Sequence, residues 1–95
     1  MADDKVSQCR VAVSIFDQEY VVKSREEEAY VRELASYLDR KMREIHHKSP
    51  HLTPHKVAVL TALNLVDELF KVRKEYEGLL ELIEQAKKTT RAETL

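Results

Sequence analysis

The four histidines of the chain lie close together, at His46, His47, His51 and His55. Histidine is a common metal ligand and titrates near neutral pH, so this cluster could bind a metal or respond to protons. A zinc site needs a complete set of rigidly placed ligands, but the Ser49-Pro50 and Thr53-Pro54 pairs divide these residues, and they cannot share one helical face. We therefore expect no metal site. His46 and His47 are interpreted as donors at a helix C-terminus, or as groups that tune a partner contact.

No other residue pattern predicts catalysis. A phosphate-binding loop needs several glycines, and the chain has one, Gly78. The serines, the threonines and the single cysteine, Cys9, are too dispersed to place a nucleophile beside a base and an orienting group. We expect a protein that is not an enzyme and has no cofactor.

The composition predicts a small, mainly helical protein. Its 95 residues are 35% charged and include one glycine and two prolines, a composition that favours long helices. The net charge of −1 argues against a nucleic-acid or membrane-surface binder, because both usually carry a basic excess. A lone cysteine, no signal-peptide pattern and no run of about 18 apolar residues predict a cytoplasmic protein without membrane insertion.

The first structural element predicted from the pattern is a β-hairpin. Residues 10–16 (RVAVSIF) place β-branched side chains at alternate positions, as a strand does, and residues 20–23 (YVVK) predict a second strand. The polar residues 17–19 join them. An isolated hairpin is barely stable in water, so this one must pack on another element.

Two helices are predicted after the hairpin. Ser24 and Glu27 have the spacing of a capping box, which predicts a helix start. An apolar stripe then continues to about His47. Thr53-Pro54 supplies an N-cap and a proline at the first helical position, and the second helix is expected to continue to about Lys88, over roughly 50 Å.

The second helix changes character along its length. Residues 57–66 (VAVLTALNLV) are apolar nearly all round and are expected to be buried on most sides. Asn64 lies among them, so its amide is expected to hydrogen-bond to one specific packing partner. Farther along, apolar residues repeat with the heptad spacing of a coiled coil.

The heptad seam could pack on the first helix of the same chain. However, the second helix is much longer than the first, so its distal turns have nothing within the chain to cover them, and self-association is the better interpretation. Leu80 and Leu82 flank the seam, which favours an association of four helices. The residues expected at oligomer contacts are Ala62, Leu65, Leu69, Val72, Tyr76, Leu79, Leu80, Leu82 and Ile83.

Basic residues are concentrated between positions 40 and 56, where Glu44 is the single acidic residue. This segment is either a solvated helix face with its loop or a docking patch for an acidic partner, since such patches speed encounter and set orientation. Its basic residues are Arg40, Lys41, Arg43, Lys48 and Lys56.

Together these features resemble the ZapA family of bacterial cell-division proteins. The resemblance rests on the hairpin segment SIFDQEYVV, on the order of the elements and above all on ALNLVDEL. In that run, Asn64 and Glu68 stand in the family signature A-L-N-I/L-x-x-E-L. Asp17 departs from the glycine that is common in the family's hairpin.

The resemblance implies a non-enzymatic protein of the division septum that binds the tubulin-like GTPase FtsZ. Such a protein cross-links or bundles FtsZ protofilaments and promotes assembly of the Z-ring. Family members form homodimers, and two dimers associate through their long helices. The resemblance also implies that the charged head faces FtsZ, and the residues expected there are Gln18, Lys23, Arg40, Arg43, Lys48, His55 and Lys56.

We therefore predict a mainly α fold with a small N-terminal β-hairpin, which gives an α+β head, and a long C-terminal coiled-coil helix. The expected segments are a disordered tail (1–8), a globular head (9–66), a coiled-coil oligomerisation segment (67–88) and a frayed tail (89–95). Two alternatives are a generic coiled-coil adaptor for another acidic partner and a small nucleic-acid-binding dimer that uses residues 40–56. The near-neutral charge counts against the second.

Overall fold

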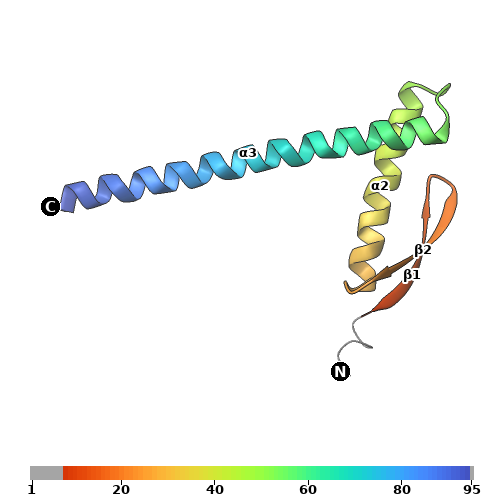
Figure 1. The fold of residues 1–95 in the computed structure, drawn as a ribbon, viewed down its shortest axis with the longest axis horizontal. Helices are drawn as coiled ribbons and strands as arrows, with labels where there is room; N and C mark the ends of the chain where they lie inside the picture. The colour runs from red at the N-terminus through yellow and green to blue at the C-terminus, as the bar shows by residue number, and fades with distance from the viewer. Residues whose placement is uncertain (1–7, 95) are drawn as a thin grey trace. The chain divides into compact units, whose positions relative to one another are not determined.

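A computed structural model describes residues 8–94, with side chains up to Thr89. The elements are β1 (Cys9–Ile15), β2 (Gln18–Ser24), α2 (Glu28–Lys48) and α3 (Pro54–Thr94), shown in Figure 1. The chain forms two compact units that divide after Thr61. A hairpin followed by two helices, the second of them long, confirms the predicted fold class.

The hairpin has longer strands and a tighter turn than the sequence predicts. Ile15 pairs with Gln18 across a turn made by Phe16 and Asp17 alone, so residues 17–19 are not the connection. Phe16 and Asp17 have φ angles of 51° and 66°. Positive φ at both central residues is the pattern of a type I′ turn, whose twist matches that of the strands. The turn was missed because such turns normally carry Asn-Gly or Asp-Gly.

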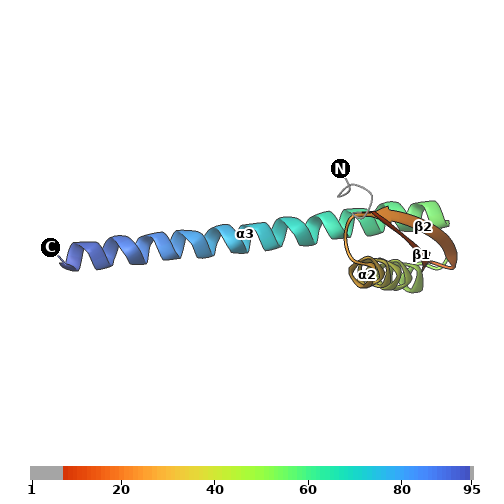
Figure 2. The same ribbon diagram turned by 90° about the horizontal axis from the view of Figure 1, so that it is seen from below.

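One face of the hairpin packs on α2 and forms the core of the first unit. Val11 and Val13 from β1 meet Val31 and Ala35 from α2, and all four are buried. Alternate strand residues share one face, as do helix residues four positions apart, so each element contributes one apolar stripe. Figures 1 and 2 both show the hairpin beside α2. The predicted strand face is thereby confirmed.

The start of α2 corrects the predicted capping box. Glu27 is the N-cap residue and makes no side-chain capping hydrogen bond. Ser24 still belongs to β2, and its hydroxyl oxygen accepts a hydrogen bond of 2.9 Å from the Glu26 N–H. Because β2 continues through Ser24, its side chain supports the bend between strand and helix and cannot cap the helix itself.

The predicted start of α3 is confirmed. Thr53 Oγ1 accepts a 3.3 Å hydrogen bond from the Lys56 N–H, and the Thr53 carbonyl accepts one of 3.0 Å from the Val57 N–H. Pro54 occupies the first helical position, where a missing N–H leaves no bond unmade. Val57, one turn after Pro54, and Thr61, one turn after Val57, are fully buried. The Thr61 hydroxyl donates to the Val57 carbonyl at 2.7 Å, so this buried polar group is satisfied.

The far end of α3 lies beyond the predicted position. The helix continues to Thr94, past the end expected near Lys88, because no glycine or proline follows Gly78 to stop it. Of the tail expected at 89–95, Leu95 lies outside the described residues. So does the tail expected at 1–8, except for Gln8, which has no regular structure.

The expected burial of residues 57–66 is mostly wrong for the single chain. Val57 and Thr61 are buried, but Val59, Leu60 and Leu63 are exposed, and Asn64 is exposed as well. The segment is apolar all round, whereas only the face with Val57 and Thr61 is covered within the chain. Within residues 8–94, no helix is both long and apolar enough to cross a membrane.

Candidate partner-binding surfaces

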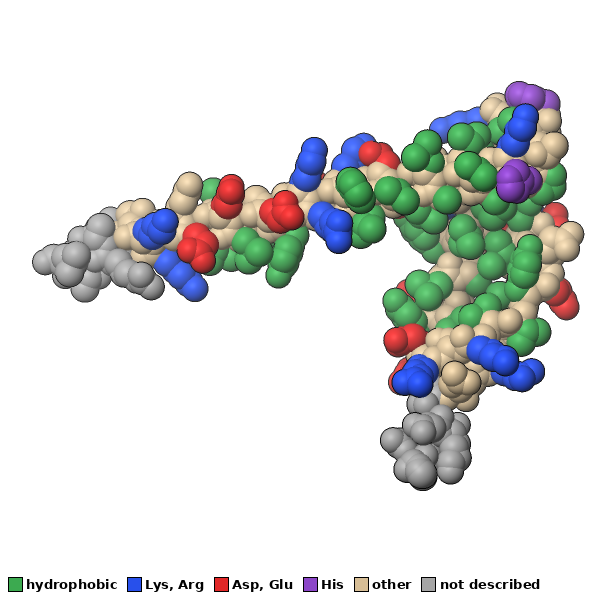
Figure 3. All heavy atoms as spheres, in the orientation of Figure 1, with side chains coloured by type: hydrophobic (Ala, Val, Ile, Leu, Met, Phe, Trp, Pro, Cys, Tyr) green, Lys and Arg blue, Asp and Glu red, His purple; other side chains and the backbone are tan. Residues whose placement is uncertain are grey.

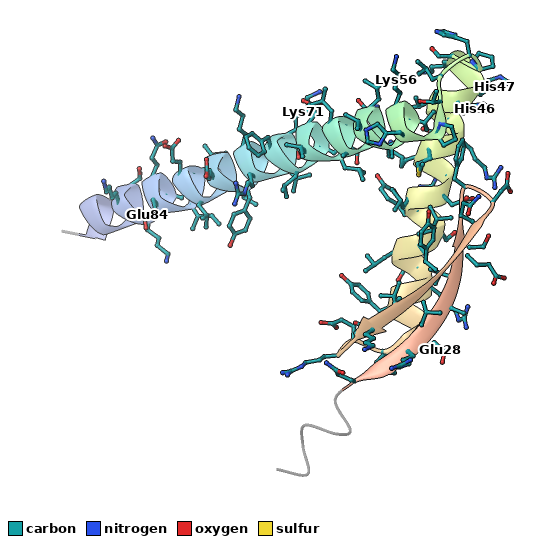
Figure 4. All side chains as sticks on the ribbon, turned by 45° about the vertical axis from the view of Figure 1, so that its right-hand side comes forward. Glu28, His46, His47, Lys56, Lys71 and Glu84 are labelled. Carbon is teal, nitrogen blue, oxygen red and sulfur yellow. The ribbon has the colours of Figure 1, made fainter. Side chains whose placement is uncertain are left out.

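The histidines of the first unit lie in different environments. His46 and His47 lie in the last turn of α2, as predicted (Figure 4). The His46 ring meets the Phe16 ring edge-on, with the ring centroids 5.4 Å apart and the planes at 76°, so it packs against the hairpin turn. His47 is exposed. Among the residues that the structure describes, no group of His, Cys, Asp and Glu could hold a metal ion.

The hairpin turn is fastened by two side chains of α2. Asp39 Oδ1 accepts a 2.7 Å hydrogen bond from the Phe16 N–H. Asp39 Oδ2 accepts one of 3.0 Å from Arg43 Nε, and Arg43 Nη2 lies 2.9 Å from Asp17 Oδ1. Asp39 and Arg43 are one helical turn apart, so both face the hairpin. We term Phe16, Asp17, Asp39 and Arg43 the turn clamp.

The charges of the turn clamp reinforce one another. The hydrogen bond from Arg43 lowers the pKa of Asp39 below its usual value, and the hydrogen bond from the Phe16 N–H lowers it further. Burial has a smaller effect that raises this pKa. The bonds to Asp39 and then to Asp17 raise the pKa of Arg43. Asp39 and Arg43 therefore stay ionised at neutral pH. Each of these ion pairs lies close to solvent and therefore contributes little to stability by itself. Their main effect is to hold the hairpin turn in one position against α2.

The turn clamp must offset the conformational free energy of two residues with positive φ, Phe16 and Asp17. A non-glycine residue in the left-handed region is less stable by roughly 1–2 kcal/mol, and the cost is greater for a bulky residue such as Phe16 than for Asp17. The hydrogen bond from the Phe16 N–H to Asp39 directly holds the residue with the larger cost. Two further contacts hold Phe16. Its ring packs against the His46 ring, and the guanidinium carbon of Arg43 lies 5.9 Å from its ring centroid.

The structure brings part of the predicted basic patch together. Arg40, Arg43 and Lys48 line one shallow surface on α2, with Asp39, Glu44 and His47 among them. Several of the charges have neighbours, because Lys41 Nζ lies 3.9 Å from Glu44 and the Arg40 guanidinium lies 4.8 Å from the Tyr37 ring centroid. The patch is therefore a mixed surface, with acidic side chains between the cations.

The other predicted contact residues lie elsewhere in the first unit. Lys56 is exposed on the first turn of α3 (Figure 4), and Lys23 is exposed near the end of β2. Gln18 and His55 line a different surface, an apolar groove, and not the shallow basic surface on α2. The seven residues predicted to meet FtsZ thus do not form one cluster in the single chain.

The apolar groove has a volume of about 990 Å³ and lies among β2, α2 and the start of α3. It exists because α2 packs mainly on β1 and leaves the inner face of β2 partly uncovered. Tyr20 is consequently 50% exposed, although it shares a face with the buried Val13. The groove was not predicted, since the strand pattern shows which face is apolar and not how much of it a helix covers. Its apolar side chains include Tyr20, Val22, Leu38, Met42 and Ala58.

The predicted heptad seam is exposed in the second unit. Leu69, Val72, Tyr76, Leu79 and Ile83 are between 44% and 63% exposed. The flanking leucines, Leu80 and Leu82, are exposed too. Figure 3 shows hydrophobic side chains gathered along this part of α3, with charged side chains between them. Large apolar side chains are therefore exposed to solvent along this helix in the single chain.

A hairpin head with a charged surface, followed by a long helix with an exposed heptad seam, defines a small, mainly helical protein with exposed charged and apolar surfaces. Comparison with known families identifies the group more closely. The family model described as "Cell division protein ZapA" matches residues 11–95, and the chain belongs to this family.

Individual relatives agree with this assignment. "Cell division protein ZapA" of Shouchella clausii is 49% identical over 69 residues, which are 73% of this chain and 88% of the relative. The protein of the same description from a Geobacillus strain is 42% identical over 82% of this chain and 90% of the relative. The resemblance seen in the sequence is thereby confirmed.

A solved structure also matches. The "ZapA mutant dimer from Geobacillus stearothermophilus" is 38% identical, with a TM-score of 0.65, over 81% of this chain and 90% of that one. The chain is therefore a member of a cell-division family whose fold it shares.

Proposed function

We propose that this protein binds FtsZ and cross-links or bundles its protofilaments, and so promotes Z-ring assembly at the division septum. It acts in the cytoplasm, as a binding protein and not as an enzyme. The observation that carries the proposal is the exposed seam of α3, where Leu79 is 56% exposed in the single chain. A protein that joins filaments needs more than one binding head, and a helix that pairs with copies of itself supplies them.

Self-association is proposed in two stages. A head that includes residues 9–66 carries the partner contacts, and the coiled-coil segment 67–88 joins copies into a homodimer. Leu80 and Leu82 lie beside the seam and are exposed, so two dimers can associate through them. The dimeric relative supports the first stage. Leu65 and Ala62 belong to the proposed contact, although Leu65 is already half-buried within the chain.

The proposed contact with FtsZ is electrostatic. Arg40 and Lys48 are exposed on the shallow surface of α2, and cations there would meet acidic groups of the filament. We propose that the residues facing FtsZ are Gln18, Lys23, Arg40, Arg43, Lys48, His55 and Lys56.

Co-sedimentation with GTP-assembled FtsZ tests the proposal. The full chain should pellet with the filaments and increase light scattering as bundles form. A charge-reversed variant, Arg40→Glu with Lys48→Glu, should bind much more weakly. Lys74→Glu with Arg73→Glu is the matched control, because it reverses the same number of charges on the part of α3 that belongs to the second unit.

Two outcomes would count against the proposal. If the wild-type chain does not pellet with FtsZ, the protein is not an FtsZ cross-linker, and a coiled-coil adaptor for another acidic partner becomes the better interpretation. If both charge-reversed pairs weaken binding equally, the contact is a general charge effect and not a surface on α2.

A further inference from the structure

We propose that Asp39 is a positioning residue of the partner-binding surface: it fixes the strained hairpin turn against α2, so that Gln18, which follows the turn and lines the apolar groove, is held in one position for the partner. This inference rests on the proposed function, because it assigns a role within the surface that meets FtsZ. It also divides the roles of the two arginines on that surface. Arg40 contacts the partner only, whereas Arg43 holds the turn in addition to facing the partner.

The turn needs fastening because it contains no glycine. Phe16 and Asp17 both have positive φ, a conformation that glycine adopts without a steric penalty and that other residues avoid. With either residue released from its contacts, the local backbone preference would favour other turn geometries. The position of Gln18, the next residue along the chain, would then vary.

Asp39 is the centre of the fastening because both of its carboxylate oxygens are used. One accepts the main-chain N–H of Phe16 at 2.7 Å, and the other accepts Nε of Arg43 at 3.0 Å. Arg43 in turn reaches Asp17 at 2.9 Å. Loss of Asp39 therefore removes the direct bond to the turn and also the contact that orients Arg43.

Arg43 has two of its five N–H donors engaged at the turn, so its guanidinium is held in place within the chain. Its Nε is bonded to Asp39 and its Nη2 to Asp17, and the guanidinium carbon lies 5.9 Å from the Phe16 ring centroid. The Arg40 guanidinium lies over the Tyr37 ring at 4.8 Å from its centroid, an arrangement that keeps its N–H edges available to an acidic group. The two arginines are three positions apart and yet do different work.

The test compares Asp39→Ala, Asp39→Asn and Glu28→Ala in the full-length protein. Glu28 is the matched control, because it forms the same i,i+4 ion pair with an arginine on α2, at 2.8 Å to Arg32, at the other end of the helix (Figure 4). Two quantities are measured: the hydrogen-exchange protection of the Phe16 amide in the free protein, and the affinity for assembled FtsZ. Solution mass and helix content are measured in parallel.

We expect Asp39→Ala to abolish protection of the Phe16 amide and to weaken FtsZ binding by about fivefold to tenfold, because the released turn must be ordered again on binding. Asp39→Asn keeps an oxygen for the Phe16 N–H and should lose less of both. Glu28→Ala should change neither.

A second substitution separates positioning from direct contact. Asp17→Gly in the Asp39→Ala background gives the turn a residue that adopts positive φ freely, so it should restore affinity although the carboxylate is still missing. Failure of this rescue in a chain of normal mass and helix content would show that Asp39 acts in another way and overturn the proposal. Unchanged affinity of Asp39→Ala, with Phe16 protection lost, would overturn it too. If the wild-type chain does not bind FtsZ, the proposed function fails, whereas the exchange arm still tests the clamp.

Discussion

The hairpin turn and the seam of α3 differ in how many contacts their side chains make within the chain. At the turn, strained backbone and charged groups find partners within the chain, through Asp39 and Arg43. Along the seam, Leu69 and Leu79 stay more than half exposed. The first region is therefore complete in one copy of the chain, whereas the second is the surface that we propose meets another copy. Substitutions at the turn should change local order, and substitutions in the seam should change the mass of the assembly.

The largest effect is expected in the seam. Leu79→Glu with Ile83→Glu places charges where apolar side chains should meet, which disrupts the packing of a coiled coil. We expect the mass measured by light scattering to fall toward that of smaller species across a concentration series. Glu77→Gln with Glu81→Gln changes charge on the same turns outside the seam and should leave the mass unchanged. A wild-type chain that is already monomeric would refute the self-association of the seam.

The next largest effect is expected from a substitution in the core of the head. Val11 is 1% exposed, and Val11→Ala should lower the free energy of unfolding by about 2 kcal/mol through lost apolar burial. Val21→Ala, on the exposed face of β2, is the control and should cost much less. Denaturant titration at one fixed protein concentration measures both. Equal losses would mean that the outer face of the hairpin is covered in the assembly.

The second unit should gain stability from the loss of its glycine. A Cβ added at Gly78 meets nothing within 4 Å, and alanine is more favourable than glycine inside a helix by about 1 kcal/mol. Gly78→Ala should therefore raise the thermal midpoint of the full chain at fixed concentration. Glu77→Ala, next to it, tests whether alanine itself is responsible. A lower midpoint for Gly78→Ala would show that the glycine is needed in the packed assembly.

The smallest effect is a pH dependence from the turn clamp. The pKa of Asp39 is lower in the folded state than its unfolded value. The ionised carboxylate therefore stabilises the folded state fully above about pH 4, and this stabilisation is lost as the pH falls through the lowered folded pKa. Wild-type stability should therefore fall more than that of Asp39→Asn as the pH drops below about 4. Parallel unfolding curves at each pH measure the difference. Equal losses in the two chains would show that the carboxylate is not linked to folding.

Local patterns in the sequence were sufficient for the elements whose causes are local. The alternation in β1, the cap at Thr53 and the heptads of α3 each depend on neighbouring residues, and the structure has the strand, the cap and the exposed apolar stripe where they were expected. The capping box at Ser24 failed because a competing element, β2, includes that residue.

The features that were missed depend on distant residues. The turn at Phe16 is held by Asp39, which is 23 positions away, and no turn rule based on neighbouring residues includes such a partner. The groove beside Tyr20 depends on how far α2 covers the hairpin. Asn64 is exposed in the single chain, so the burial expected there is not provided by contacts within the chain.

The absence of glycine from the hairpin turn also bears on the order in which the head folds. A two-residue turn with a good local preference can close early, before the rest of the chain is in place. The turn of Phe16 and Asp17 has no such preference, and its stabilising bonds come from α2. We therefore expect the hairpin to form only after or together with α2, so that the helix acts as the template and the two strands are the late-forming part of the head.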